Sequence, residues 1–152
     1  MIGDGNGWVR CAQGHRHWGR HGAAGLLVRH RDDSAGTTHV LLQHRASWSH
    51  HGDTWGIPGG ARDSHETSEE AALREAVEEA GIALDLLLVS NAITDDHGGW
   101  MYVTVLAEAP AMSPVRAQNF ESVELRWVEI DDVDRLPLHP GFAATWPQLR
   151  QA

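Results

Sequence analysis

GGARDSHETSEEAALREAVEEAGI, residues 59–82, is the stretch of this chain that decides its fold. Thr67 followed by Glu70 has the spacing of a capping box, which predicts a helix beginning at about Ser68. Gly81 after Ala80 is a typical left-handed helix end. Strong helix formers fill the interval between them, so the sequence predicts one well-defined helix here.

The predicted helix carries its acids on one side. At about 100° per residue, three glutamates fall within an arc of about 100°: Glu75, Glu78 and Glu79. An apolar group lies opposite and is expected to pack on a core: Leu73, Ala76, Val77 and Ala80. Two small residues on the acidic side, Ala71 and Ala72, are expected to leave room for something bulky.

Three carboxylates on one helix face repel one another, and a single arginine, Arg74, cannot neutralise them all. Hard oxygen ligands of this kind suit Mg²⁺ or Mn²⁺, which take further ligands from substrate phosphates. The alternative is a solvated acidic face without a metal. The glycines, the arginine and the fixed spacing favour the metal site.

From Gly60 the stretch reads G-x5-E-x7-R-E-A-x-E-E-x-G-I, with Ala76 where a bulkier aliphatic residue is common. This pattern resembles the signature of the Nudix hydrolases. The resemblance implies an α/β (α+β) fold, an α/β/α sandwich with a central mixed β-sheet. It also implies divalent-metal-dependent hydrolysis of the diphosphate linkage of a nucleoside diphosphate joined to another group.

The same resemblance assigns roles within the motif. Glu75, Glu78 and Glu79 would bind one to three Mg²⁺ or Mn²⁺ ions together with the carbonyl oxygen of Gly59. Two further positions, Glu66 and Arg74, would hold the loop and orient the glutamates.

An acid outside the motif is also expected to reach the metals. Residues 119–130, NFESVELRWVEI, resemble the late strand of Nudix domains, in which such an acid shortly precedes a tryptophan. Glu124, three residues before Trp127, is the first candidate and Glu121 the second; an exposed strand acid is the alternative. The general base is left open among these two acids and the helix glutamates.

The composition of the chain limits the kinds of molecule that it is expected to bind. The chain has 152 residues and a formal charge of −9, with 12 basic residues, all arginine, against 21 acidic ones. This balance argues against long nucleic acid and permits a small nucleotide-type substrate bridged by metal. The single cysteine, Cys11, excludes an internal disulfide. The absence of a long apolar run or a signal peptide predicts no membrane partner and a cytoplasmic location; the oligomeric state is left open.

The remaining pattern predicts short strands around the central helix. The expected strands are residues 23–30, 39–44, 84–93, 100–109 and 124–130, and a final short helix is expected at 142–149. We expect an irregular N-terminal segment, residues 1–21, and a Nudix domain, residues 22–152.

A Cys/His group in the N-terminal segment offers another hypothesis. Cys11, His15, His17 and His21 form C-x3-H-x-H-x3-H, whose soft and imidazole ligands could hold zinc. The spacing fits no familiar zinc template, and we expect an ordinary surface segment whose Trp18 packs on the sheet. A zinc-stabilised interaction domain is therefore one alternative function, and a non-catalytic Nudix-fold nucleotide sensor is another.

Three tryptophans near the motif are candidates for the substrate pocket. Trp48, Trp55 and Trp100 could stack on a nucleobase, although core packing is the commoner role of tryptophan. The sequence does not identify the substrate, so a nucleoside triphosphate, including an oxidised one, is the default expectation.

Overall fold

A mixed β-sheet forms the centre of the molecule. The computed structural model describes residues 3–119 and 121–152 of the chain. Its seven strands are β3 (Ala23–Asp32), β4 (Thr37–Arg45), β5 (Trp55–Gly56), β6 (Gly59–Ala61), β7 (Leu88–Asp96), β8 (Met101–Glu108) and β9 (Ser122–Glu129). Met1, Ile2 and Phe120, which fall in stretches considered above, lie outside the described residues.

The sheet is mixed because one of its pairings is parallel. The main order is β5-β4-β3-β8-β7, with β6 also pairing with β3 and β9 with β4. β3 and β8 run parallel, with Ala23 opposite Tyr102, whereas the other pairs are antiparallel. This arrangement confirms the expected α/β fold with a mixed central sheet and flanking helices.

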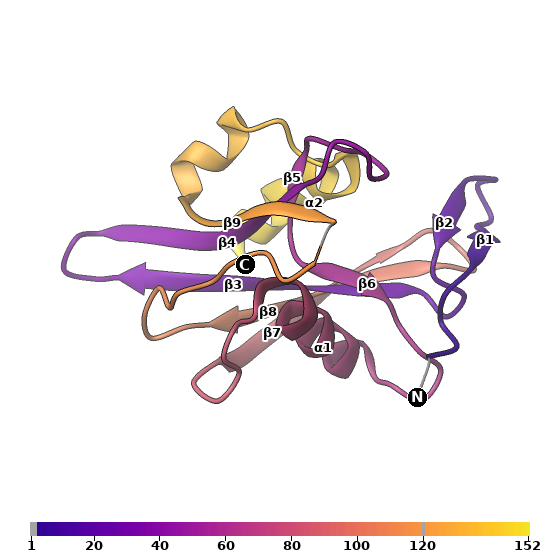
Figure 1. Ribbon diagram of the computed structural model, residues 1–152, viewed down its shortest axis with the longest axis horizontal. Helices are drawn as coiled ribbons and strands as arrows, with labels where there is room; N and C mark the ends of the chain where they lie inside the picture. Colours follow the sequence, from indigo (N-terminus) through magenta and orange to yellow (C-terminus); the bar gives the residue numbers. More distant parts are fainter. Residues whose placement is uncertain (1–2, 120) are drawn as a thin grey trace.

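Helices cover both faces of the sheet (Figure 1). On one face α1 (Ser68–Ala80) packs against β3 and β6, burying its alanines on Leu26 and Val105. On the other face α2 (Pro140–Gln151) packs Phe142 and Trp146 against Leu27 and the rest of a second apolar cluster. A short helical turn, η1 (Ile130–Arg135), leads from β9 towards α2.

α1 begins and ends where the sequence predicts. Thr67 caps it, with its hydroxyl accepting from the Glu70 N–H, and the Glu70 carboxylate accepts from the Thr67 N–H. Gly81 ends it in the left-handed conformation, with φ 63°. Both signals are local in sequence, which is why they locate the helix so closely.

The orientation of α1 differs from the expectation. Ala71 and Ala72 are fully buried against the sheet, whereas Val77 is 43% exposed. The prediction that Val77 packs on the core, with space beside Ala71 and Ala72, is therefore wrong. The helix is rotated so that part of its acidic side faces the sheet, and Glu79 is among its buried residues.

Several expected elements have shifted bounds. The strand expected at residues 84–93 begins only at Leu88 and continues to Asp96. The final helix is longer than residues 142–149, because Pro140 occupies its first turn, where a missing N–H does no harm.

β7 lies at the edge of the sheet, beside β8. Its register with β8 shifts between Val89 and Asn91, and Leu88 is 69% exposed. Exposed and half-buried side chains alternate along this strand except at residues 90–92, beside the shift in register.

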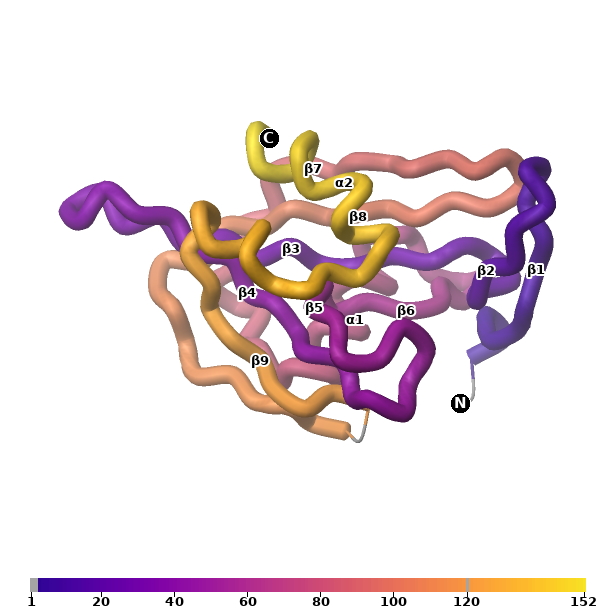
Figure 2. The backbone as a smooth tube through the Cα atoms, turned by 90° about the horizontal axis from the view of Figure 1, so that it is seen from above, coloured from indigo at the N-terminus to yellow at the C-terminus, as the bar shows by residue number. Residues whose placement is uncertain are grey.

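The N-terminal segment is not irregular as expected, because β1 (Trp8–Arg10) and β2 (Arg16–Trp18) pair as an antiparallel hairpin. Figure 2 shows this hairpin against the turn between β7 and β8. Trp18 does not pack on the main sheet; it is 45% exposed and meets Trp8 edge to face. Within the described residues, no helix is long and apolar enough to cross a membrane.

Candidate functional site

The glycines of the motif allow α1 to approach the sheet with its carboxylates inward. Gly59 and Gly60 lie in β6, which pairs with the start of β3. A Cβ on Gly60 would lie 2.6 Å from Glu75 Oε1, so a side chain there would displace this carboxylate. The Gly59 N–H donates to Glu79 Oε2 at 3.0 Å. The missing side chain of Gly60 thus leaves the space that the Glu75 carboxylate fills, and the backbone of Gly59 binds Glu79.

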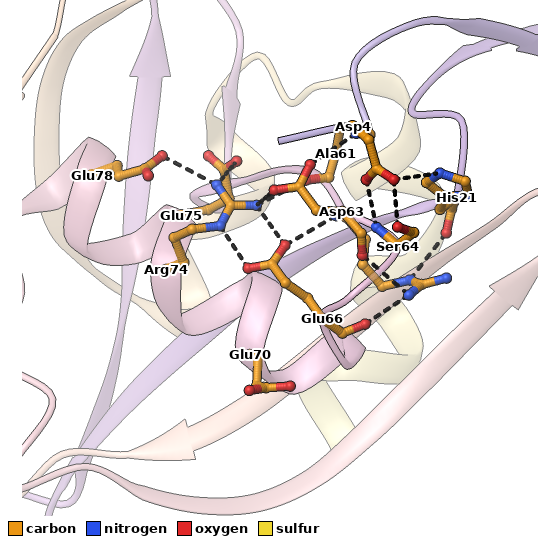
Figure 3. A network of polar contacts seen from close by, with 12 residues as sticks. Asp4, His21, Ala61, Asp63, Ser64, Glu66, Glu70, Arg74, Glu75 and Glu78 are labelled. Carbon is orange, nitrogen blue, oxygen red and sulfur yellow. Dashed lines mark hydrogen bonds and ion pairs between the residues drawn. The ribbon is translucent and has the colours of Figure 1, made fainter. Parts of the chain in front are cut away.

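Arg74 holds the motif loop on the helix (Figure 3). Its Nε donates to Glu66 Oε2 at 2.7 Å, and one terminal nitrogen donates to Glu66 Oε1 at 2.9 Å and to the Ala61 carbonyl at 3.0 Å. The other terminal nitrogen contacts Glu75 Oε1 at 2.9 Å and Glu78 Oε2 at 3.3 Å. One guanidinium therefore connects the loop with two of the helix glutamates.

Glu66 is fixed as an anion. The hydrogen bond from Arg74 and a second one from the Asp63 N–H hold the pKa of Glu66 below its usual value, against the effect of burial. Its side chain is only 8% exposed. A buried carboxylate with both oxygens already engaged orients its neighbours rather than meeting a ligand itself.

Glu75 and Glu79 have the opposite electrostatics. Burial, followed by the negative charge of Glu75, raises the pKa of Glu79 to about 8. Burial also raises the pKa of Glu75, although Arg74 opposes this, and Glu78 and Glu121 add to it. Burial and the neighbouring acids together therefore disfavour the charged form of the buried Glu79 and of the partly buried Glu75.

Glu78 lies apart from this pair. Its side chain is 54% exposed and contacts Arg74. Among the described residues, the carboxylates of Glu75, Glu78 and Glu79 are not all within 4.8 Å of one another. Glu78 is therefore more exposed than the partly buried Glu75 and the buried Glu79.

The two acids considered outside the motif are placed differently. The charge of Glu121 acts on both Glu75 and Glu79, and its backbone carbonyl accepts from the Ala46 N–H at 2.8 Å. Glu124 instead accepts two hydrogen bonds from Arg126, each of 3.0 Å. The charge of Glu121 therefore affects both helix glutamates, whereas the carboxylate of Glu124 is paired with Arg126.

The three candidate tryptophans occupy different surroundings. Trp55 is 5% exposed, with its ring stacked on His44 and covered by Arg126, so no free face remains for a base. Trp100 stacks on His17 and lines a hollow of about 610 Å³ at the start of α1, beside Ser68 and away from the glutamates. Trp48 is 67% exposed in the loop after β4.

Sequence reasoning missed two residues of this region. Tyr102 on β8 approaches Gly59 closely, since a Cβ there would lie 2.5 Å from its hydroxyl. Burial, with the charges of Glu79 and Glu75, raises the pKa of Tyr102 and keeps it a phenol. The second is Arg45, whose positive charge opposes the rise in the pKa of Glu79 that burial causes. Arg45 is far from Glu79 in the sequence, so no local signal indicates this effect.

The comparisons with known proteins agree with this geometry. Residues 19–149 match the NUDIX domain family. The chain is 54% identical over 159 aligned positions to the Mycobacterium tuberculosis protein named "Putative 8-oxo-dGTP diphosphatase 3", covering 100% of this chain and 72% of that protein. It is 47% identical to a Bifidobacterium longum "Nucleoside triphosphate pyrophosphatase/Nudix hydrolase fusion protein", covering 95% of this chain and 31% of that one.

A solved structure has the same architecture. The crystal structure of the Nudix hydrolase RenU from M. smegmatis superposes with a TM-score of 0.90 at 52% identity. The match covers 97% of this chain and 94% of that one.

Proposed function

Because the chain belongs to the Nudix hydrolase family, we propose that it hydrolyses an oxidised purine deoxynucleoside triphosphate, with Mg²⁺ or Mn²⁺ bound at the helix glutamates. It is a Nudix pyrophosphohydrolase. We therefore prefer hydrolysis as its principal function over the two alternatives, a nucleotide sensor and a zinc-stabilised interaction domain. Its relatives imply a nucleotide-type small-molecule substrate, and the family is typically dependent on divalent metal.

The pair Glu75 and Glu79 is the observation that carries the metal assignment. Glu79 is buried and Glu75 is partly buried, both have raised pKa values, and Arg74 contacts only Glu75. A divalent cation supplies the missing positive charge, and the all-oxygen donor set suits Mg²⁺ or Mn²⁺. In this proposal Glu78 leaves Arg74 to complete the set together with the Gly59 carbonyl.

A bound divalent ion would neutralise charge on the diphosphate and lower the pKa of the attacking water. Arg74 and Glu66 keep Glu75 in place and hold the loop beside it, and Gly60 keeps the space open. As the general base that takes the proton of the attacking water, we favour Glu121 over Glu124. The negative charge of Glu121 contributes to the raised pKa values of Glu75 and Glu79, whereas Glu124 is hydrogen-bonded to Arg126. The helix glutamates remain the other candidates.

Substrate identity rests on the relatives and on one aromatic ring. The M. tuberculosis relative is named for 8-oxo-dGTP and spans this whole chain. Trp48 has an exposed ring, and the neighbouring Ala46 is bonded to Glu121, so we assign base stacking to this tryptophan rather than to Trp55 or Trp100.

The test is a comparison of kcat/KM values with Mg²⁺ and with Mn²⁺. The panel contains 8-oxo-dGTP, dGTP, dATP, ADP-ribose and a dinucleoside tetraphosphate. We expect the highest kcat/KM for 8-oxo-dGTP, with release of pyrophosphate, and a KM raised about tenfold or more by Trp48→Ala. A clear preference for ADP-ribose or the dinucleotide would refute the substrate assignment while leaving the family unaffected.

A further inference from the structure

Cys11, His17 and His97 meet at one end of the main sheet. Cys11 follows β1, His17 lies in β2, and His97 lies in the turn between β7 and β8. One potential ligand atom from each residue lies within 4.8 Å of the others. Figure 2 shows how the hairpin and the turn come side by side, although they are far apart in the sequence.

Backbone contacts fix the two loops together. The Ala12 N–H donates to the Gly98 carbonyl at 2.7 Å. Gly98 has φ 75°, and a Cβ there would lie 2.7 Å from the Ala12 Cβ. Trp100 stacks on the His17 ring with centroids 4.0 Å apart. The three ligand residues are therefore held near one another by contacts that do not depend on a metal.

Their polar atoms are incompletely used. Cys11 is 6% exposed and free. His17 Nε2 is buried and has no hydrogen-bond partner among the described residues. His97 Nε2 lies 2.9 Å from Asp95 Oδ2, the contact with a carboxylate that commonly orients a metal-bound histidine. A buried ring nitrogen without a partner is unfavourable, and an ion bound between this nitrogen and the Cys11 thiol would satisfy it.

We propose that Cys11, His17 and His97 bind one zinc ion that ties the N-terminal hairpin to the β7–β8 turn. A thiolate and two imidazoles are ligands that suit zinc, whereas magnesium prefers oxygen ligands. A water molecule would complete the tetrahedral coordination. His15 and His21, which the sequence pattern grouped with Cys11 and His17, lie outside the set, and His97 takes their place.

The zinc ion would also support the motif loop from a distance. The same N-terminal segment contacts this loop, because the Gly5 N–H donates to Asp63 Oδ1 at 2.8 Å and the Ser64 N–H donates to Asp4 Oδ1 at 2.7 Å. Fixing the hairpin at its far end therefore restrains a segment that contacts the loop carrying Glu66.

The first experiment uses metal binding alone. Full-length protein freed of metal with a chelator is titrated with Zn²⁺ in competition with a chromophoric chelator, and separately with Co²⁺. We expect one Zn²⁺ per chain with a Kd below about 1 µM, and a thiolate-to-Co²⁺ charge-transfer absorption. Neither readout depends on nucleotide hydrolysis, so failure here leaves the proposed substrate untouched.

Variants locate the ion. Cys11→Ser should remove the charge-transfer absorption, and both Cys11→Ser and His97→Gln should weaken Zn²⁺ binding at least about 100-fold. His15→Gln is the matched control and should bind as the wild type does. Glu79→Gln should also retain Zn²⁺, which separates this ion from metal at the helix glutamates.

Absence of Zn²⁺ binding in the wild type, or unchanged binding in His97→Gln, would overturn the proposal. If Cys11→Ser does not fold, His97→Gln and the wild-type Co²⁺ spectrum still decide the question, because the partly exposed His97 contributes little to the core.

Discussion

Replacing Glu79 by glutamine should stabilise the metal-free protein at high pH. The carboxylate of Glu79 is buried beside Glu75, and its pKa is raised from 4.5 to about 8. Between these values the folded state retains a proton that the unfolded state has lost. The free energy of unfolding therefore falls as pH rises through this range, by about 1.4 kcal/mol per pH unit.

The magnitude follows from the size of the shift. A difference of about 3.5 pKa units corresponds to about 5 kcal/mol as an upper value, reached above the folded-state pKa. Glutamine does not titrate, has nearly the same shape, and can still accept the hydrogen bond from Gly59. Glu79→Gln should thus unfold at nearly the same denaturant concentration as the wild type at about pH 4.5 and exceed it increasingly up to about pH 8.

Urea unfolding followed by tryptophan fluorescence, with a chelator present and at a series of pH values, measures this difference. Subtracting the unfolding free energies of the two proteins cancels the titration of the shared groups that do not interact with Glu79. Glu78→Gln is the control, because its 54% exposed carboxylate should change stability by no more than about 0.5 kcal/mol. A wild-type-minus-Glu79→Gln difference that stays constant between about pH 5 and pH 8 would refute the buried-charge reasoning.

The other predictions concern turnover. Glu79→Gln should lower kcat/KM at least about 100-fold with Mg²⁺ present, and near-normal turnover would remove Glu79 from the metal site. Chelation should abolish hydrolysis, added Mg²⁺ should restore it, and activity should rise with pH as the attacking water loses its proton; unchanged turnover after chelation would contradict the mechanism. Gly60→Ala should lower kcat/KM about tenfold or more, because its Cβ would lie 2.6 Å from Glu75 Oε1. Gly56→Ala, whose Cβ would make only ordinary contacts, is the control. Arg74→Lys should lower kcat about tenfold or more with an unchanged circular dichroism spectrum, because lysine cannot bridge Glu66 and Glu75 together; full activity would exclude an orienting role.

Local signals in the sequence were sufficient to predict the bounds of α1 and the residues that make up the motif. The cap at Thr67 and the stop at Gly81 are set by residues three or four positions apart, so no tertiary information is needed. The side on which α1 is buried was not predictable in the same way. It depends on tertiary contacts with β6, where the Gly59 N–H binds Glu79 and Gly60 leaves room for Glu75, and these contacts go with a helix face on which Glu79 is buried and Val77 is exposed.

Long-range pairing explains the other differences. The difference between Glu121 and Glu124 depends on how the residues just before β9 meet the loop after β4, where the Ala46 N–H donates to the Glu121 carbonyl. The grouping of Cys11 with His97 depends on the β7–β8 turn reaching the hairpin. Neither pairing follows from spacing along the chain, because each joins residues from separate elements.

The shifted register of β7 has a consequence for self-association. A regular edge strand offers a row of free N–H and carbonyl groups on which another chain can build, and this is a common beginning of aggregation. The irregularity between Val89 and Asn91 interrupts that row, and Asp95 and Asp96 place negative charge near its end. Two copies that approach edge to edge would meet an irregular hydrogen-bonding pattern and repulsion between like charges. Both oppose fibril growth on this edge, although Leu88 is exposed there.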